Sequence, residues 1–416
     1  MRIDARRHLS SVRRLAGALM IVIVAGCAGP AGPSVVPSAG PSSTAAAPSE
    51  PAATPTPTTS GSPAPTQVPS KSTPPPASPP PATTTAAAPT LAQLIGQKLM
   101  VRMSGTTPSA SLLARVRAGQ IGGVILFGSN VISPAQVASL AAKLQAAARR
   151  GGQPPLLIAT DQEGGTVKRI PWAPPTLSPP QMGSIGSTST ARSQGLAAGN
   201  ALLGLGIDCD LAPVADVPGS TSSFMYQDGR TWSFDPAVTS SLSNAFARGL
   251  EAAGVAPSMK HFPGIGLATQ NTDSFVVTIT ASQAQLAPGL QPYSTAIAKA
   301  MPMIMLSNAT YTAYDPINGA GWSRAIVKGL LRDQMGFHGV TITDSLSGTA
   351  KAQGIPVSTL AIRAAIAGTD MILVTGSEAA TQATYETLLA AARAGSIPAH
   401  RLLVSYQRIL ALKASL

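Results

Sequence analysis

Residues 122–161 read GGVILFGSNVISPAQVASLAAKLQAAARRGGQPPLLIATD. An apolar run at 122–128 is followed by an Ala- and Leu-rich stretch with helical spacing at 134–150. A second apolar run at 155–161 then ends on an aspartate. Short apolar runs separated by a helical pattern predict a strand–helix–strand unit with parallel strands. The fold therefore depends on how often this unit is repeated.

The same alternation continues along the chain. Further apolar runs lie at 98–103, 208–217, 255–262, 302–308, 338–345 and 370–376, separated by helical patterns, and a last helix is expected at 401–416. About eight repeats in roughly 300 residues favour a single (β/α)8 barrel over an open doubly wound sheet. No Gly-rich dinucleotide fingerprint follows the first run, which also counts against a Rossmann domain.

Polar residues stand at the ends of several of these runs. Asp161 ends LLIATD, Lys260 and His261 end VAPSMKH, Asn308 ends MIMLSN and Asp344 ends VTITD. The carboxyl ends of barrel strands meet at one face, where active sites lie. One such residue could cap a helix or form a turn, but residues on four separate strands predict a shared site.

The first residues of the chain predict export. Residues 2–14 hold five arginines against Asp4, and the apolar run that follows at 15–26 has 12 residues, too short to span a bilayer. Cys27 comes next, after small residues, as in a bacterial lipobox. Residues 1–27 are therefore expected to be a lipoprotein signal peptide, which would place the protein at the outer face of the membrane, in the cell wall or outside the cell. An ordinary cleaved signal with a chance cysteine is the alternative.

Composition divides the remainder into two parts. Residues 28–89 are almost entirely Ala, Pro, Ser, Thr and Gly, and are expected to form a disordered linker because they cannot bury enough apolar surface. Residues 90–416 are long enough for one large core. Their single cysteine, Cys209, excludes an internal disulfide.

Net charge and residue spacing limit the kinds of partner that the sequence predicts. The formal net charge is +12, which suits an anionic polymer of the cell envelope or simple solubility. No basic run with interleaved aromatic residues is present, so nucleic acid is not expected. Neither Cys/His spacing nor carboxylate clustering indicates a metal. No cofactor is expected, and a monomer is favoured.

Several motifs make residues 90–416 resemble the family 3 glycoside hydrolases, in the branch of bacterial N-acetyl-β-glucosaminidases. In chain order they are GGVILFGSNV, ATDQEGGTVKRI, DLAPVADV, DGRTWSFDP, MKHFPG, GLLRDQMGFHGVTITDSL and AAIAGTDMILV. Several motifs in register are more specific than any single one. The resemblance implies a (β/α)8 barrel and a glycosidase of the β-N-acetylhexosaminidase type, acting on amino sugars of cell-wall material.

The resemblance also implies roles for single residues. Asp344, in TDSL, matches the nucleophile, which forms a covalent glycosyl-enzyme that water then cleaves with retention; a cap of the following helix is the alternative. The residues that match sugar-binding positions are Asp161, Arg230, Lys260 and His261, and Glu163 and Asp216 are expected to orient them. Arg230 could instead pair on the surface, and Lys260 could instead satisfy a buried acid.

The sequence departs from the family pattern at the proton donor. The family usually reads D-S-H, with the histidine and aspartate as acid/base pair, but this chain has Asp273-Ser274-Phe275. Asp273 is thus the remnant of the pair, able to act alone if an apolar loop raises its pKa. Other departures are Ile265 in place of the histidine of G-H-G, Thr166 in place of an arginine, and Gly348 where methionine is common.

Two functions remain open from the sequence, with a third on the same scaffold. The first is a hydrolase with reduced or altered activity, because Asp344 and the binding residues are present. The second is a barrel that binds a glycan or cell-wall fragment without efficient turnover, because of Ile265, Thr166 and Phe275. Phosphorolysis or another glycosyl transfer is the third. Of the four histidines in the chain, only His261 is expected at the site.

Overall fold

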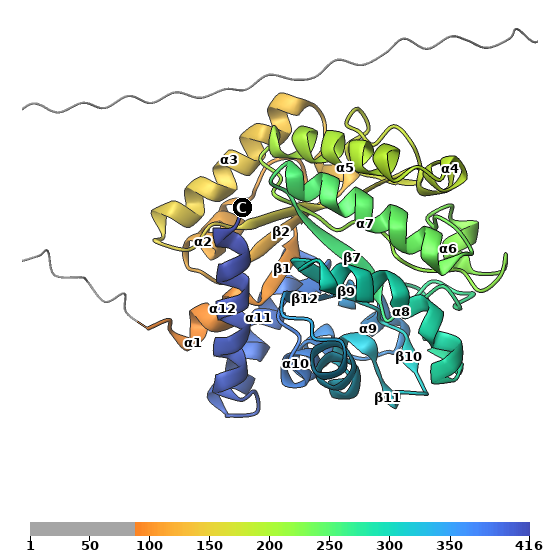
Figure 1. The fold of residues 1–416 in the computed structure, drawn as a ribbon. Helices are drawn as coiled ribbons and strands as arrows, with labels where there is room; N and C mark the ends of the chain where they lie inside the picture. The colour runs from red at the N-terminus through yellow and green to blue at the C-terminus, as the bar shows by residue number, and fades with distance from the viewer. Residues whose placement is uncertain (1–87) are drawn as a thin grey trace, which may run out of the picture. The chain divides into compact units, whose positions relative to one another are not determined.

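The computed structural model describes residues 88–416, which form a parallel eight-stranded barrel surrounded by helices (Figure 1). The barrel strands, in order around the ring, are β1 (Leu99–Arg102), β2 (Gly123–Leu126), β3 (Leu157–Thr160), β6 (Cys209–Asp210), β7 (Ala256–Phe262), β9 (Met303–Leu306), β12 (Val340–Thr343) and β13 (Ile372–Val374). Pairing of β1 with β13 and a bridge between Ile342 and Met371 close the ring. Each apolar run of the sequence supplies one strand, and the predicted (β/α)8 barrel is confirmed.

Helices connect the strands and cover the outside of the barrel (Figure 1). The longer ones are α2 (Ala110–Arg117), α3 (Pro134–Arg150), α5 (Thr188–Leu203), α7 (Pro236–Ala252), α8 (Gln283–Ala298), the π-helix η3 (Ala325–Gln334), α10 (Val357–Ala367), α11 (Glu378–Arg393) and α12 (Ala399–Ala414). The boundaries of α3 follow from its sequence. Ser133 caps the first turn by accepting from the Gln136 amide, Pro134 occupies the first helical position, and Gly151 follows the last.

Shorter helices and two small sheets lie outside the ring of barrel strands. The helices among them are α1 (Leu91–Gln97), η1 (Gly128–Asn130), α4 (Pro179–Ile185), α6 (Phe224–Gln227), η2 (Ala320–Trp322) and α9 (Leu346–Ala352). Two small sheets, which the sequence pattern does not predict, are β4 (Gln162–Gly164) with β5 (Val167–Lys168), and β8 (Thr278–Ile279) with β10 (Thr310–Tyr311) and β11 (Asp315–Gly319). They follow β3, β7 and β9, so they build the carboxyl-terminal face of the barrel.

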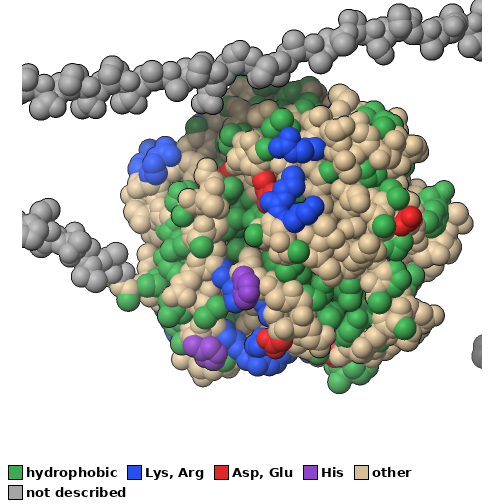
Figure 2. Space-filling view, in the orientation of Figure 1, with side chains coloured by type: hydrophobic (Ala, Val, Ile, Leu, Met, Phe, Trp, Pro, Cys, Tyr) green, Lys and Arg blue, Asp and Glu red, His purple; other side chains and the backbone are tan. Residues whose placement is uncertain are grey.

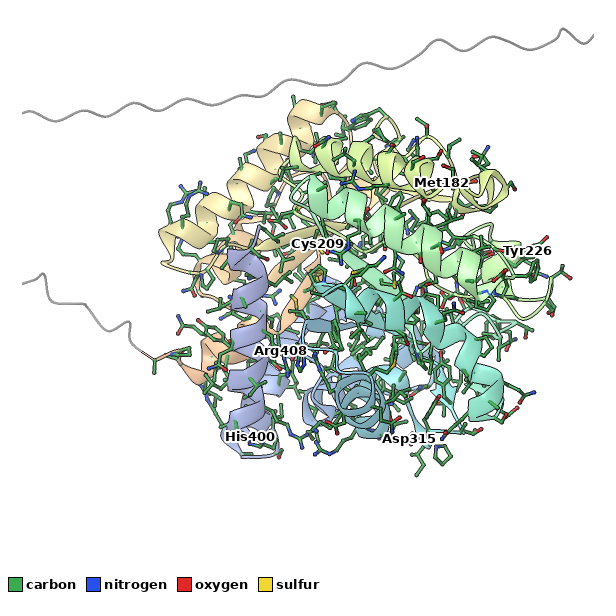
Figure 3. The ribbon with its side chains drawn as sticks, in the orientation of Figure 1. Met182, Cys209, Tyr226, Asp315, His400 and Arg408 are labelled. Atoms are coloured by element: carbon green, nitrogen blue, oxygen red, sulfur yellow. The ribbon has the colours of Figure 1, made fainter. Side chains whose placement is uncertain are left out.

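The interior of the barrel is apolar and closed at its amino-terminal end. Alternate strand residues, among them Met100, Ile125 and Cys209, form one buried cluster with Ile409 and Leu412 of α12. Figure 3 labels Cys209 inside the barrel. A second set of strand residues faces the outer helices. Because Ile409 and Leu412 of α12 fill one end, the barrel interior is open only at its carboxyl end.

The predicted signal peptide, with Cys27, and the predicted linker up to residue 87 lie outside the described residues. Within residues 88–416 no helix is both long and apolar enough to cross a membrane.

Candidate active site

A cavity of about 250 Å³ opens at the carboxyl ends of the barrel strands. It brings together every catalytic and sugar-binding residue expected within the described part of the chain, namely Asp161, Arg230, Lys260, His261, Asp273 and Asp344. These residues come from the ends of β3, β7 and β12 and from the loops that follow β6 and β7. Parallel strands in register place side chains that are far apart in sequence around one opening.

Three charged side chains line this cavity together with Asp161, namely Glu163, Arg230 and Lys260. The Lys260 Nζ donates to Asp161 Oδ1 at 2.8 Å and lies 2.7 Å from Glu163 Oε1. Arg230 grips Glu163 with two bonds, from Nε at 2.9 Å and from Nη2 at 2.8 Å. The four residues are thus one connected network, in which Arg230 pairs inside the cavity rather than on the surface.

Glu163 remains ionised at the centre of this network. Burial opposes its charge, but the cations of Arg230 and Lys260 outweigh burial and lower the pKa of Glu163 to about 2. In return Asp161 and Glu163 overcome the burial of Lys260 and raise its pKa. The network therefore holds two cations fixed beside the cavity at any pH where a protein is normally handled, with donors ready for sugar hydroxyl or acetamido oxygens.

His261 is held by a second buried carboxylate. Its Nδ1 lies 2.7 Å from Asp216 Oδ2, and the other Asp216 oxygen accepts from the Ile265 amide at 2.8 Å. This contact, together with the bond from the Ile265 amide to the same carboxylate, fixes the plane of the imidazole. The Nε2 atom faces the cavity, 4.0 Å from Asp344 Oδ2. Asp216 thus holds the His261 ring in place, and Glu163 holds the side chains of Arg230 and Lys260 in place.

Asp344 lies at the end of β12 with one carboxylate oxygen directed by the backbone. Its Oδ1 accepts from the Ser345 amide at 2.7 Å, and its own amide donates to Leu306 O at 2.9 Å. The helix α9 has Ser345 at its cap position, so Asp344 does not cap it. The side chain is 19% exposed, which leaves Oδ2 accessible from the cavity.

Asn308, the remaining strand-end residue, does not line the cavity. Its side-chain amide donates to Ser345 O at 2.8 Å and to Thr349 Oγ1 at 2.9 Å. It therefore fixes the turn between β12 and α9 on which Asp344 stands, and contributes to the site only through that turn.

The loop after β7 brings Asp273 to the rim of the cavity. Thr349 Oγ1 donates to Thr272 O at 3.1 Å, and Gly348 lies directly under the backbone of Asp273, where a Cβ would fall 2.5 Å from Asp273 O. Surrounding protein atoms and the charge of Asp344 raise the pKa of Asp273 to about 6. Phe275 is outside the cavity lining and 48% exposed. Glycine at 348 therefore permits a close docking of this loop on α9.

The other two departures from the family pattern have different consequences. Ile265 is 2% exposed and forms part of the cavity wall, so an apolar surface replaces an imidazole there. Thr166 lies outside the lining and donates to Asp228 O at 2.7 Å.

Arg169, which the sequence analysis does not name, lines the cavity 3.8 Å from Asp161 and 5.6 Å from the Phe127 ring. A cation is therefore present beside Asp161 despite Thr166.

Asp210, on β6, is a second residue that the sequence reading passed over. It is fully buried, and its Oδ1 accepts from the Gln162 amide at 2.9 Å. Burial raises its pKa to about 8, so at neutral pH it is mostly protonated and adds little charge beneath the network. The sequence offers no signal for this beyond a second aspartate in DCDLAP.

Comparison with known proteins places this arrangement in a family. Residues 90–412 match the model of the glycosyl hydrolase family 3 N terminal domain. The chain belongs to this family. An uncharacterized secreted glycosyl hydrolase of Arthroderma benhamiae is 35% identical over 334 residues, which cover 78% of this chain and 94% of that protein. A beta-hexosaminidase of Xylella fastidiosa (strain M23) is 32% identical over 285 residues, covering 66% of this chain and 82% of the relative.

Solved structures of the family agree with the barrel. A beta-N-acetylglucosaminidase from Paenibacillus sp. str. FPU-7 superposes with a TM-score of 0.74 at 31% identity, over 79% of this chain and 63% of that one. A beta-N-acetylhexosaminidase from Beutenbergia cavernae DSM 12333 gives a TM-score of 0.73 at 32% identity, over 79% of this chain and 99% of that one. The family 3 chain described here thus spans less than two thirds of the Paenibacillus structure and nearly all of the Beutenbergia one.

Proposed function

We propose that this chain is a retaining glycosidase that hydrolyses β-linked N-acetylhexosaminides, with amino sugars of the cell envelope as the substrate class. The observation that carries this proposal is the position of Asp344 in one cavity with the buried network of Asp161, Glu163, Arg230 and Lys260. The relatives named beta-hexosaminidase and beta-N-acetylglucosaminidase support the choice of sugar.

The network suits the binding of a sugar hydroxyl face. Lys260 and Arg230 supply donors, and the Asp161 carboxylate accepts from hydroxyl groups while its partner Lys260 holds it in place. Buried, preformed pairs lose little freedom when the substrate arrives, because their side chains are already ordered. The network therefore sets the position of the sugar ring, and with it the distance from the anomeric carbon to Asp344.

The reaction runs in two steps. Asp344 Oδ2 attacks the anomeric carbon, the bond to the leaving oxygen breaks, and that oxygen takes a proton from an acid. Water then attacks the same carbon and the bond to Asp344 breaks. The group that acted as the acid is now deprotonated, and it accepts a proton from this water. The configuration at the anomeric carbon is retained because it is inverted twice.

Asp273 is the group that we assign as acid and base. It lines the cavity that contains Asp344 and is held there by the contacts of the loop with Gly348 and Thr349. Its raised pKa, about 6, leaves a protonated fraction near neutral pH. Among residues 88–416, His261 is the one histidine that lines this cavity, so a carboxyl group takes the place of the usual imidazole.

A glycan-binding barrel without turnover is the second candidate. It is favoured by Phe275, which stands at the family's histidine position and is exposed outside the cavity. In that case the network would hold a sugar, and Asp344 would not react. The two candidates differ only in chemistry, so a rate measurement separates them.

The test compares aryl N-acetyl-β-glucosaminides with good and poor leaving groups. The wild type should cleave both, Asp344→Ala neither, and Asp273→Asn should lose about 10²–10⁴-fold on poor leaving groups but far less on good ones. Glu386→Gln, an exposed carboxylate on α11, is the control and should match the wild type.

Each alternative result has one meaning. If the wild type and Asp344→Ala are equally inactive while N-acetylglucosamine raises the melting temperature, the chain is a binding barrel. If Asp344 is essential but Asp273→Asn behaves as the wild type with every leaving group, the hydrolase proposal stands and the assignment of Asp273 is wrong.

We also propose that the protein is exported and held at the membrane by a lipid on Cys27, with residues 28–89 as the tether. The relative described as secreted supports export. Cys27→Ala should move the protein from the membrane fraction to the medium of the expressing bacterium. An unchanged distribution between these fractions would contradict lipid attachment.

A further inference from the structure

A second cavity, of about 350 Å³, lies away from the one described above and shares no lining residue with it. Its walls are η3, the segment that leads into β12, the end of α10 and the first half of α12. Since these segments enter β12 and β13 at their amino ends, the cavity is on the opposite side of the barrel from Asp344.

The lining of this cavity is strongly basic. Within residues 88–416, its cationic and titratable lining residues are Arg324, Lys328, Arg332, Arg401, Arg408, His338 and His400, and Asp333 is the one carboxylate in the lining. Figure 2 shows Lys, Arg and His side chains gathered on this part of the surface, and Figure 3 shows Arg408 and His400 on the same helix, α12. The side chains come from two helices and a loop, so their gathering is a product of the fold.

Two carboxylates compensate only part of this charge. Buried Asp370 pairs with Arg332 at 2.6 Å and with Arg408 at 3.3 Å, and exposed Asp333 pairs with Lys328. Arg332 is further committed to the carbonyl oxygens of Phe337 and Gly339. These residues are the frame of the cavity.

Arg324 and Arg401 are different, because neither has an ion pair or a side-chain hydrogen bond within residues 88–416. Burial and then the charge of Arg324 lower the pKa of Arg401. Two guanidinium groups that repel each other beside a basic frame are more stable when an anion lies between them, because each then gains a charge-assisted hydrogen bond.

We infer that this cavity is a binding site for a phosphate group, with Arg324 and Arg401 as its principal ligands. Guanidinium groups match phosphate with paired hydrogen bonds, and a site with more than one uncompensated cation favours a group that carries nearly two charges over a monocarboxylate. The volume is within the range of small-ligand sites, about 300–1,000 Å³. The exposed Val404 and the buried Val327 add an apolar wall, which leaves room for a group attached to the phosphate.

The phosphate can belong to a free small molecule or to a repeating polyanionic chain, and two probes distinguish these sources. Calorimetry at about 150 mM ionic strength, where long-range attraction is screened, should give saturable binding of pyrophosphate at one site per chain. If the dissociation constant of long-chain polyphosphate, counted per polyphosphate molecule, is lower than that of pyrophosphate, the source is a polymer. If it does not, the source is a free phosphate compound.

The decisive variant is Arg324→Gln/Arg401→Gln. Both side chains reach solvent and hold no structural bond in the described residues, so the fold and the glycosidase activity should not change. The dissociation constant for pyrophosphate should rise about tenfold or more, as expected for two charge-assisted contacts. Arg149→Gln/Arg150→Gln, at the end of α3, removes the same charge from another surface and should leave binding intact.

Three results would overturn the inference. They are no saturable pyrophosphate binding to the wild type, equal weakening by the two double variants, or binding of citrate as tight as that of pyrophosphate. The second would show attraction to net charge alone, and the third would show no preference for phosphate.

Discussion

Gly348→Ala is the substitution that most directly tests how the loop positions Asp273. The alanine Cβ would lie 2.5 Å from Asp273 O and 2.9 Å from Asp273 Cα, whereas ordinary contact begins at 3.4 Å. These are backbone atoms, so no side-chain rotation relieves the overlap. Because α9 packs on β13 and α10, the loop is the part that yields, by about an ångström.

The expected effect is on rate and not on stability. A misplacement of about 1 Å in a reacting group can cost about 10²-fold, so we expect a loss of that order in kcat/KM for a phenyl N-acetyl-β-glucosaminide. A dinitrophenyl leaving group departs without a proton and should lose much less. Alanine is the better helix former by about 1 kcal/mol, which offsets part of the strain, so the melting temperature should change little.

Gly329→Ala is the matched control, because it makes the same change in a helix with nothing within 4 Å of the new Cβ. It should leave both substrates unaffected. A folded Gly348→Ala enzyme with wild-type rates on the phenyl substrate would refute the reasoning. An equal loss on both substrates would also refute it, because such a loss would not come from proton transfer.

Three further predictions follow from the same geometry. Glu163→Gln should lower the free energy of unfolding by about 3–5 kcal/mol in urea titrations, because it leaves two buried cations poorly paired; exposed Glu386→Gln should not, and a loss below about 1 kcal/mol would contradict the network. The kcat/KM of the wild type on poor leaving groups should fall as pH rises through about 6, since Asp273 must be protonated to act as the acid; if Asp273→Asn keeps the same falling limb, another group is responsible. Phe275→His should not raise turnover of poor leaving groups, because position 275 lies outside the cavity; a clear gain would show that the loop moves during the reaction.

The strands and their polar ends could be predicted because both depend on local sequence. Each barrel strand is an apolar run, and the predicted 134–150 helix coincides with α3 because its cap, its proline and its closing glycine all lie within the same stretch. The last helix, predicted at 401–416, differs by two residues at each end from α12, which begins after Pro398 without a side-chain cap. Asp161, Lys260, His261 and Asp344 converge because parallel strands bring their ends together in any such barrel.

Other features arise only from tertiary contacts. Nothing near Arg169 in the sequence says that its side chain reaches Asp161. The close approach of Asp273 to Gly348 joins a loop to helix α9, and these two residues lie 75 positions apart in the numbering. Whether Phe275 faces the cavity or the solvent depends on that approach. The residues alone therefore name a nucleophile, a missing histidine and Asp273 as the remaining carboxyl group, but not the contacts with Gly348 and Thr349 that hold Asp273 at the cavity.

The basic cavity shows the same division. The sequence by itself determines the barrel, the order of its strands and the aspartate at the end of β12, because these follow from hydrophobic periodicity and strand polarity. Only the folded chain decides that Arg324 and Arg401 face one opening, since they lie on different helices and have no shared local pattern. Local pattern is encoded over a few residues, whereas charge in a cavity is a sum over segments that meet only after the barrel has closed.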